Sequence, residues 1–582
     1  MATQSVESAK TSGGFSRLIP ILSWLPGYNR AWLAADIFAG LTLWGLVVPQ
    51  GMAYAGIAGL PPQFGLYTLV ASLLVYALFG SSRHLSVGAT SASAALIAST
   101  VIAVGATAAD MTTYSAYAVA LVIVVGVVFL VAGLARLGWV TQFLSKPVMD
   151  GFVVGLAIFV AVGQLNKLFG VAKGEGNTFQ KFFAVIQQLP EANWVTFAVG
   201  ASALALLFLL PRWNKKIPAG LVVLFGSIIV SVALQLNALY GVDVAGELPQ
   251  GLPSIALPQV PFTVVMAMVL PAIGIFLLGY SEALGVAREF AGKHGYEVDP
   301  DQELKAHAFV NVASGLVGGM IATGGMSASA VKEGAGARTQ ISNLVAWGVT
   351  IITLLFLTPL FTNLPEAVLA ALIIHAVSHI LTSRKLVKIR MVSPTEAWLG
   401  LITLLGVLFI DVLEGMIIGL VASVLLILFQ SSRPHLASLG RIPGIPGAYS
   451  DLKRHPENTA VPGVLIVRLD APMYYANALT VRERMKALVA ETQPPPRAVV
   501  LDSAGQDSLD ITSAEVLKGL LAELKGKGMD IYVAELHGPV REFSQRTGLF
   551  EMIGEDHIFP TVDAAVRSIE SSARPEKANP EA

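Results

Sequence analysis

The chain has 582 residues, of which 54% are hydrophobic and only 13% are charged, and its mean hydropathy is +0.67. Soluble domains usually contain about 25% charged residues, so this composition indicates a polytopic membrane protein. The formal net charge of −1 gives no support to nucleic-acid binding, and the absence of cysteine excludes disulfides, thiolate metal sites and cysteine nucleophiles.

Apolar stretches recur from residue 34 to residue 430, and most approach the roughly 20 residues that a helix needs to cross a bilayer. They predict a transmembrane domain over residues 31–432, preceded by a polar segment, 1–30, that we expect in the cytoplasm. We expect fourteen spans, seven in each half: 34–55, 64–80, 87–104, 114–134, 149–166, 193–210, 217–237, 262–281, 307–322, 325–336, 341–361, 364–383, 396–410 and 414–430.

Lysine and arginine residues gather in alternate loops between these spans, for example at Arg83, Arg212 and Arg384. The other loops hold almost none, except for the mixed loop 167–192. Because positively charged short loops stay cytoplasmic, this distribution predicts a multi-pass protein of the plasma (inner) membrane with both termini inside. An odd number of spans in each half then requires the second half to be inserted upside down relative to the first, so the halves form an inverted repeat.

The string Gly-x-x-Ser-Ala-Ser-Ala occurs at residues 88–94 and again at 324–330. Short, interrupted segments at matching positions of two halves indicate the binding site of a transporter. A helix that starts inside the membrane presents unpaired N–H groups and the positive end of its dipole, so two facing starts would bind an anion. The alternative is that these small residues only allow close helix packing. The hydroxyl groups near the two starts belong to Thr90, Ser91, Ser327 and Ser329.

Three further residues place polar groups inside apolar spans. Gln50 follows Pro49, which can break or kink a helix, and Tyr54 shares the face of Gln50 one turn later. These two side chains either face a cavity or form structural hydrogen bonds. Glu282 follows roughly 20 uncharged residues, and an intramembrane carboxylate costs about 2.5–3.5 kcal/mol on insertion scales, which favours a role in proton coupling. The alternative for Glu282 is a place near the inner interface, paired with Arg288.

Other chemistries find little support in the sequence. His375 and His379 stand at i, i+4 without a neighbouring carboxylate, so we expect no metal site. No Gly-x-x-x-x-Gly-Lys-Ser/Thr string occurs, so ATP-driven pumping is unsupported. We expect no enzyme and no cofactor, with a proton or sodium ion as the coupling ion.

The character of the chain changes after residue 432. We expect a proline-containing linker at 433–460, a soluble α/β domain at 461–570 and a disordered tail at 571–582. Buried strands are predicted at 463–469, 498–501 and 530–534, alternating with helices near 477–491, 512–526 and 538–547.

Several stretches of the chain resemble the sulfate permease family of anion transporters, which are related to solute carrier family 26. The end of the chain is similar to the sulfate transporter and anti-sigma factor antagonist (STAS) domain of these proteins. The stretches are Asp36 to Gly40, Val48 to Ala55, Gly59 to Tyr67, Gly80 to Gly88, Glu282 to Ala291 and Gly334 to Gln340.

The resemblance implies a UraA-like fold of seven plus seven inverted spans, divided into core and gate subdomains, and a homodimer whose cores move as elevators. It places the anion between the starts of spans 3 and 10 and gives the carboxylate of Glu282 a role in coupling to protons or sodium. The substrate-binding positions that it implies are Gln50, Tyr54, Thr90, Ser91, Ser327, Ala328 and Ser329.

Two positions depart from the family pattern. Many eukaryotic relatives have arginine where Ala328 stands, so this site lacks that fixed positive charge. A dianion would then depend on helix dipoles, hydroxyl groups and Lys332, which stands one turn later. The alternative for Lys332, which we favour, is a charge at the inner surface of the membrane. Regulatory relatives have a phosphorylated serine near Thr512 and Ser513, for which a helix N-cap role is the favoured alternative.

We therefore expect proton-coupled uptake of sulfate. Proton- or sodium-coupled uptake of bicarbonate or a dicarboxylate remains an alternative within the same fold. An uncoupled anion channel is the alternative of another class, and a receptor acting through the STAS-like domain would need a cytosolic partner.

Overall fold

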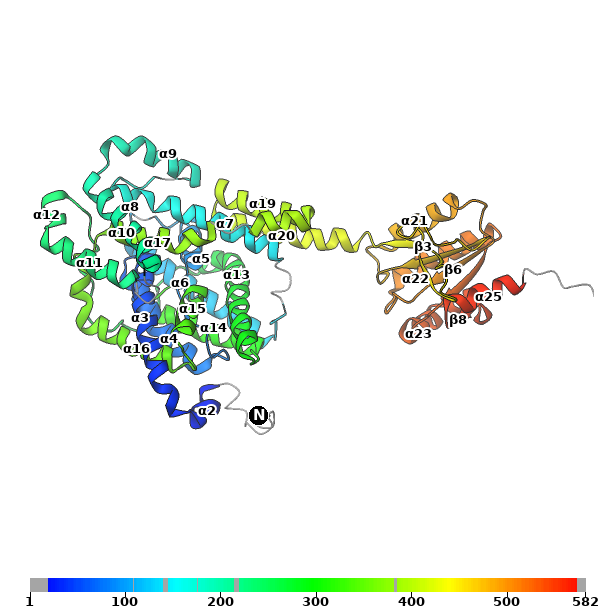
Figure 1. The fold of residues 1–582 in the computed structure, drawn as a ribbon, viewed down its shortest axis with the longest axis horizontal. Coiled ribbons are helices and arrows are strands. Elements are labelled where there is room, and N and C mark those ends of the chain that lie inside the picture. The colour runs from blue at the N-terminus through cyan, green and yellow to red at the C-terminus, as the bar shows by residue number, and fades with distance from the viewer. Residues whose placement is uncertain are drawn as a thin grey trace, which may run out of the picture. The chain divides into compact units, whose positions relative to one another are not determined.

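The computed structural model describes residues 19–107, 109–139, 145–174, 176–213, 219–381 and 385–572. The chain divides into two compact units, with the boundary between Ser423 and Val424. The first unit is helical, and the second is a sheet with helices packed on it (Figure 1).

The first half of the membrane unit runs from residue 19 to the long loop before Phe262. Before the first span lie the short helix α2 (Ile21–Trp24) and two 3-10 turns, Leu25–Gly27 and Arg30–Trp32. The α-helices and the strand that follow in this half are α3 (Leu33–Ile57), α4 (Gln63–Phe79), β1 (Val87–Gly88), α5 (Ser91–Ala103), α6 (Met111–Leu134), α7 (Lys146–Gly163), α8 (Leu165–Phe169), α9 (Thr178–Gln188), α10 (Trp194–Trp213), α11 (Ala219–Ala233) and α12 (Leu236–Tyr240).

The second half repeats the pattern of a long helix, a short strand and a short helix. Its helix α16 continues into a π-helical turn, Thr353–Leu357, and a 3-10 turn, Thr358–Phe361. Its elements are α13 (Phe262–His294), α14 (Pro300–Leu316), β2 (Thr323–Gly324), α15 (Met326–Gly334), α16 (Ile341–Ile352), α17 (Glu366–Leu381), α18 (Lys385–Val392), α19 (Pro394–Phe409) and α20 (Val412–Ser431).

Each of the fourteen expected spans contains a helix. Among the described residues, seven helices are long and apolar enough to cross a membrane, and five shorter helices are also apolar. The two remaining segments hold α14 and α15, and α14 is less apolar because its first turns contain charged residues such as Asp301 and Glu303. The helix α13 extends to His294, well beyond the expected end of its span at residue 281.

The helices pack in two groups. Helices α3 to α6 pack with α13 to α16, whereas α7, α10 and α11 pack with α17 and α19. This division matches the expected core and gate. Two of the close crossings, one in each group, require glycine: a Cβ atom at Gly65 would overlap the backbone of Gly51, and one at Gly151 would overlap the carbonyl oxygen of Gly400.

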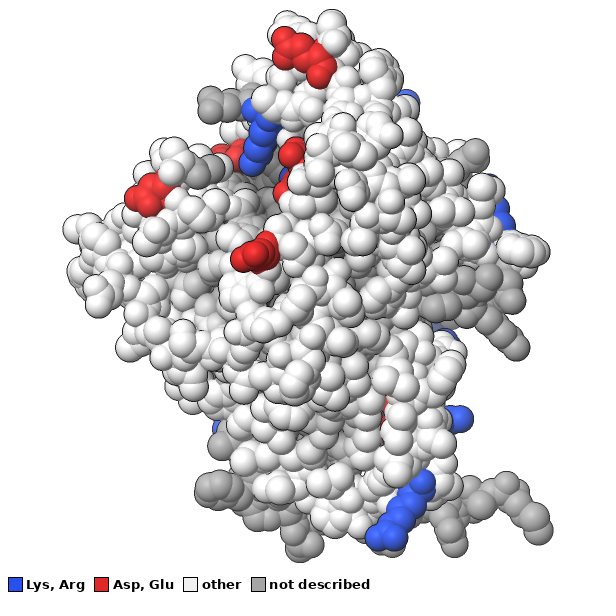
Figure 2. Space-filling model, turned by 90° about the vertical axis from the view of Figure 1, so that its left-hand side faces the viewer, with Lys and Arg blue, Asp and Glu red and all other residues white. Residues whose placement is uncertain are grey.

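The surface of this unit suits a bilayer. Figure 2 shows a face on which charged side chains gather toward the upper and lower parts, with a broad uncharged region between them. Large apolar side chains such as Phe208, Ile229 and Leu270 are exposed. Because exposed patches of this kind are rare on soluble monomers, they indicate contact with lipid.

The second unit contains a six-stranded sheet in the order β4-β3-β5-β6-β7-β8. Strands β5 to β8 are parallel, and β3 is antiparallel to both of its neighbours. The strands are β3 (Leu436–Arg441), β4 (Tyr449–Asp451), β5 (Val464–Leu469), β6 (Ala498–Asp502), β7 (Asp530–Ala534) and β8 (Ile558–Phe559). The helices are α21 (Ala478–Glu491), α22 (Ile511–Gly526), α23 (Gly538–Thr547), α24 (Leu549–Ile553) and α25 (Val562–Ser572).

Both faces of this sheet are buried. Leu465 and Val467 of β5 belong to a cluster with α21, α22 and α24, whereas Val464 and Ile466 belong to a cluster with α25. This alternation follows from the two-residue period of a strand. The three predicted strands and three predicted helices of this region are confirmed within one or two residues.

The predicted linker at 433–460 was wrong. It contributes β3 and β4, and β3 pairs with β5, so this segment belongs to the sheet. Pro443 and Pro446 lie in the turn between the two strands, where a missing N–H group costs no ladder bond. Of the predicted tail, residues 571 and 572 end α25, and 573–582 lie outside the described residues, as do residues 1–18 of the N-terminal segment.

Candidate anion-binding site

The two copies of the repeated string meet in a short ribbon. Strands β1 and β2 pair antiparallel, with Val87 opposite Gly324 and Gly88 opposite Thr323. The offset of 236 residues that relates Ser91 to Ser327 also maps Val87 onto Thr323 and Gly88 onto Gly324. Applying this offset to one of the two residue pairs therefore gives the other pair, as expected if a local two-fold axis relates the two halves. The helices α5 and α15 begin directly after this ribbon.

The start of α5 is closed by its own side chains. Thr90 is the N-cap, and its hydroxyl oxygen accepts a hydrogen bond from the Ser93 amide at 3.2 Å. The Thr90 amide in turn donates to the Ser93 hydroxyl oxygen at 3.0 Å, which completes a capping box. The amides of Ser91 and Ala92 have no acceptor among the described residues, so this helix still offers two N–H donors.

The start of α15 is open. Its N-cap is Gly325, which has no side chain to cap the helix. The first intrahelical bond runs from the Ser329 amide to the Gly325 carbonyl, so the amides of Met326, Ser327 and Ala328 find no acceptor in the described part of the chain. Unpaired N–H groups at a helix start, together with the helix dipole, favour an anion.

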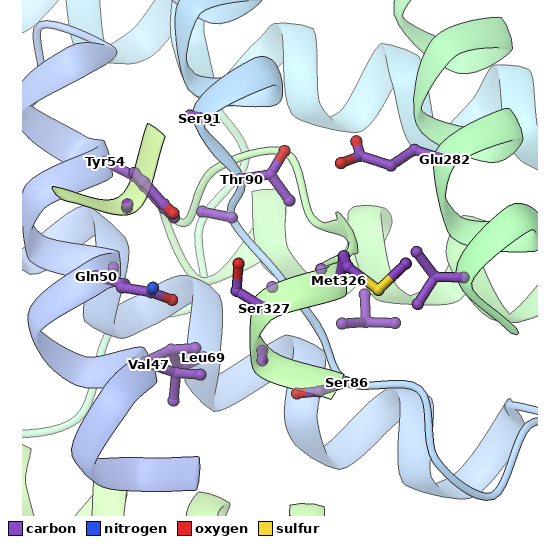
Figure 3. A pocket seen from close by; sticks show the side chains of 18 of the residues that line it. Val47, Gln50, Tyr54, Leu69, Ser86, Thr90, Ser91, Glu282, Met326 and Ser327 are labelled. Carbon is purple, nitrogen blue, oxygen red and sulfur yellow. The ribbon is translucent and has the colours of Figure 1, made fainter. Parts of the chain in front are cut away.

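A cavity of about 370 Å³ lies at these two helix starts. Gln50 and Tyr54 reach it from α3, and Glu282 reaches it from α13. Figure 3 shows the Glu282 carboxylate directed toward Thr90, and the Gln50 amide directed toward Ser327. The cavity therefore has backbone N–H groups, hydroxyl groups and an amide on its walls, and one carboxylate.

The structure brings almost all of the predicted site residues together. Those that line the cavity are Gln50, Tyr54, Thr90, Ser91, Ser327, Ala328 and Glu282. Ser329 does not line it, because its side chain is buried and its hydroxyl oxygen accepts a hydrogen bond from the Ser86 amide at 2.9 Å. Ser329 thus joins α15 to the segment before β1.

The sequence analysis missed part of the wall. Ser86 and Met326 contribute from the core, and Val153 of α7, Ala376 and Val377 of α17 contribute from the gate group. The repeated string gives no indication of Val153, Ala376 or Val377, because they are ordinary apolar residues of other spans. The gate residues show that the cavity lies between the two helix groups.

Glu282 has no charged partner in the described part of the chain. No lysine, arginine or histidine nitrogen there lies within the 4.0 Å of an ion pair, so the alternative pairing with Arg288 is not formed. The carboxylate shares its cavity with Tyr54 and with the two helix starts. Glu282 is therefore a carboxylate on the cavity wall that has no ion-pair partner among the described residues.

The position of Lys332 differs from the favoured expectation. We expected an inner-surface charge, but this side chain has an exposed fraction of 0%. It lies in the last turn of α15, where helix packing covers it completely.

Two further predictions concern metals and regulation. Among the described residues no group of three or more potential ligands could hold a metal ion. The His375 ring packs on Phe208, and the side chain of His379 lies outside the described part.

In the second unit, Asp510 rather than Thr512 or Ser513 caps α22, because its side chain accepts a hydrogen bond from the Ser513 amide at 2.7 Å. Thr512 is exposed and Ser513 is fully buried.

Comparison with known proteins agrees with this architecture. The model of the sulfate permease family matches residues 33–403, and the STAS domain model matches residues 455–565. A probable sulfate transporter of Mycobacterium tuberculosis is 33% identical over 560 residues, which cover 95% of this chain and 99% of the relative. The chain belongs to the sulfate permease family. It is accordingly a membrane transporter of anions with a C-terminal STAS domain, and not an enzyme.

More distant relatives extend the comparison. The chloroplastic sulfate transporter 4.1 of Arabidopsis thaliana is 28% identical, with coverage of 97% of this chain and 84% of the relative. The structure of SLC26A9 matches with a TM-score of 0.88 at 23% identity, covering 96% of this chain and 93% of that one. The transmembrane domain of the cyanobacterial bicarbonate transporter BicA matches with a TM-score of 0.59 at 24% identity, covering 68% of this chain and 98% of that one. At these identities the two solved structures establish the fold alone.

Proposed function

We propose that this sulfate permease family member is a secondary active transporter that takes up sulfate together with protons. The observation that supports this proposal most directly is the pair of helix starts aimed at one cavity that also contains Glu282. The helix starts suit an oxyanion, and an intramembrane carboxylate that has no ion-pair partner in the described part of the chain suits a proton carrier. The relatives named above as sulfate transporters support the choice of anion.

An elevator movement accounts for how this site would reach both sides of the membrane. The ribbon of β1 and β2 holds both helix starts on the core group, whereas Val153 and Ala376 complete the cavity from the gate group. Sliding the core against the gate would carry the anion and Glu282 together. We also propose that both termini lie in the cytoplasm, that the protein is a homodimer, and that the STAS domain has a cytosolic partner.

Transport by proteoliposomes tests this function. Labelled sulfate, bicarbonate and fumarate would be offered in turn, each with an imposed proton or sodium gradient. We expect sulfate to accumulate with a proton gradient. Preference for bicarbonate or fumarate, or dependence on sodium, would replace the substrate or the coupling ion. A flux that ignores every gradient and exceeds about 10³ per second, beyond the usual range of turnover, would indicate a channel.

The variant Glu282→Gln tests the coupling role. The amide keeps the shape of the side chain but cannot release a proton, so we expect gradient-driven accumulation to fall more than tenfold while sulfate exchange across the membrane continues. Glu289→Gln is the matched control, because Glu289 lies on the same helix but is exposed outside the cavity. Intact gradient-driven uptake by Glu282→Gln would exclude the coupling role.

A further inference from the structure

Lys332 is a buried lysine whose hydrogen-bond partners are all neutral. Its ammonium group donates hydrogen bonds to the carbonyl oxygen of Leu85 at 3.3 Å, to Gln340 Oε1 at 3.3 Å and to Asn343 Oδ1 at 3.0 Å. The side chain is among the largest fully buried ones in the protein. Three acceptors satisfy the N–H groups of the ammonium, but none of them carries a negative charge.

No carboxylate of the described residues forms an ion pair with Lys332. None lies within the 4.0 Å of an ion pair with the Lys332 nitrogen. Glu333, the next residue, pairs instead with Lys293 at 2.7 Å and His294 at 3.0 Å. Asp36 is also fully buried and attracts Lys332 without pairing with it, because its oxygens accept hydrogen bonds from the Tyr28 hydroxyl, the backbone amide of Arg338, and the amide and hydroxyl of Thr339. Since a buried charge without a directly paired counter-ion is costly, an anion bound nearby would stabilise the charged form of Lys332.

The cavity of the proposed site is where such an anion would bind. Lys332 lies one helical turn after Ala328, roughly 6 Å along α15, and Ala328 lines the cavity. Lys332 does not itself line the cavity, and its amino group lies on Leu85, Gln340 and Asn343, so it would act on an anion there through its charge and not by direct contact. Its acceptor Leu85 directly precedes Ser86, which is another residue of the cavity wall.

We propose that Lys332 makes this site selective for doubly charged oxyanions over singly charged ones. The inference rests on the proposed function and names the substrate class of the same site. Each helix start contributes about half a positive charge, so two starts and Lys332 sum to about +2 when Glu282 is protonated. A dianion balances this charge, whereas a monoanion leaves half of it uncompensated.

Coulomb's law gives this proposal a quantitative signature. The interaction of Lys332 with a ligand is proportional to the charge of the ligand, so its energy doubles from a monoanion to a dianion. Removing the lysine charge should therefore weaken dianion binding by the square of the factor that it costs a monoanion. Loss of a purely structural brace would instead weaken both ligands by the same factor.

Such a brace is present beside Lys332 and supplies a matched control. The Gln340 side-chain amide donates to the carbonyl oxygens of Ser82 at 2.6 Å and Leu85 at 2.9 Å. Gln340→Ala removes these bonds and one acceptor of Lys332, but it leaves the ammonium in place. This variant reports what loosening the segment before β1 does without changing its charge.

The experiment measures the dissociation constants of sulfate and perchlorate, two tetrahedral anions that differ mainly in charge. Calorimetric titration of the full-length protein at one pH would compare the unmodified chain with Lys332→Gln, Gln340→Ala and Asn343→Asp. The last variant keeps Lys332 and places a carboxylate next to it, so the charge is cancelled even if Lys332→Gln does not fold. We expect Lys332→Gln and Asn343→Asp to weaken perchlorate about fourfold and sulfate about sixteenfold, and Gln340→Ala to weaken both equally.

The outcomes separate this inference from the function on which it rests. Equal losses for the two anions in the charge-changing variants, or no loss, would overturn the selectivity role while leaving anion transport intact. Binding of neither anion to the unmodified protein would overturn the proposed function, and the inference with it.

Discussion

The starts of α5 and α15 share the same string of small residues but differ in how they are capped. Thr90 stands before the first helix and closes it in a box with Ser93. The equivalent position of the second helix is Met326, whose thioether is only a weak hydrogen-bond acceptor, and the cap is Gly325, so no side chain caps this helix. The first start thus offers two free amides and the second offers three.

The second serine of each string, Ser93 in the first and Ser329 in the second, has a similar role in the two halves. The Ser93 hydroxyl donates to the carbonyl oxygen of Ile321 at 3.0 Å, and the Ser329 hydroxyl accepts from the Ser86 amide at 2.9 Å. Each serine therefore binds the strand segment of the opposite half. The comparison teaches that one string can serve two purposes: its serines join the halves, and the residue before each helix decides how open that helix start is.

The largest effect should come from the two glycines that begin the strings. A Cβ atom at Gly324 would lie 2.8 Å from the Ala283 Cα atom and 2.9 Å from Leu85 Cδ1, whereas one at Gly88 would meet only Leu69 Cδ2 at 3.5 Å. Overpacking of this kind costs roughly 1–3 kcal/mol. We expect Gly324→Ala to lower thermal stability and abolish sulfate uptake, and Gly88→Ala to retain most of both. Similar losses in the two variants would contradict the asymmetry.

The next effect concerns the cap of α5. Thr90→Ala removes the side chain that binds the Ser93 amide, which should cost about 1 kcal/mol of stability. Met326→Ala removes no capping bond and serves as the control at the equivalent position. Thermal unfolding of the purified variants measures the difference. If Met326→Ala were the more destabilising change, the two starts would not differ in the way described.

The smallest effect should separate the two cavity hydroxyl groups. Ser327 is exposed to the cavity at the open start, whereas Ser91 is more enclosed. A net hydrogen bond is worth about 1 kcal/mol, and water in the cavity replaces part of it. We expect Ser327→Ala to raise the dissociation constant of sulfate about threefold and Ser91→Ala to raise it less. Unchanged affinity in the double variant would leave only the backbone amides as ligands.

Much of the fold follows from hydropathy and charge. Every expected span contains a helix, because apolar stretches of suitable length leave few alternatives in a bilayer. The strands β3 and β4 were missed because prolines and glycines, such as Pro443 and Gly444, look like a linker in sequence. They mark instead a turn beside an antiparallel pair, and only tertiary pairing with β5 distinguishes the two cases.

The site was predictable where residues are polar within apolar spans, as for Gln50 and Glu282, or where they stand at a repeated helix start. Ser329 and Lys332 were misplaced for a common reason. Both lie on a short helix whose buried face depends on the segment before β1, more than 240 residues away in the sequence. The spacing along the chain contains no information about such a contact.

The ribbon of β1 and β2 has a consequence for how the anion site can form. Each strand finds its partner only in the other half, and the pairs Val87–Gly324 and Gly88–Thr323 exchange under the repeat. A polypeptide of half this length could form the same ribbon only with a second copy inserted in the opposite orientation. An anion site of this kind therefore belongs to neither half of the chain alone, and it exists only once both halves have been inserted in opposite orientations.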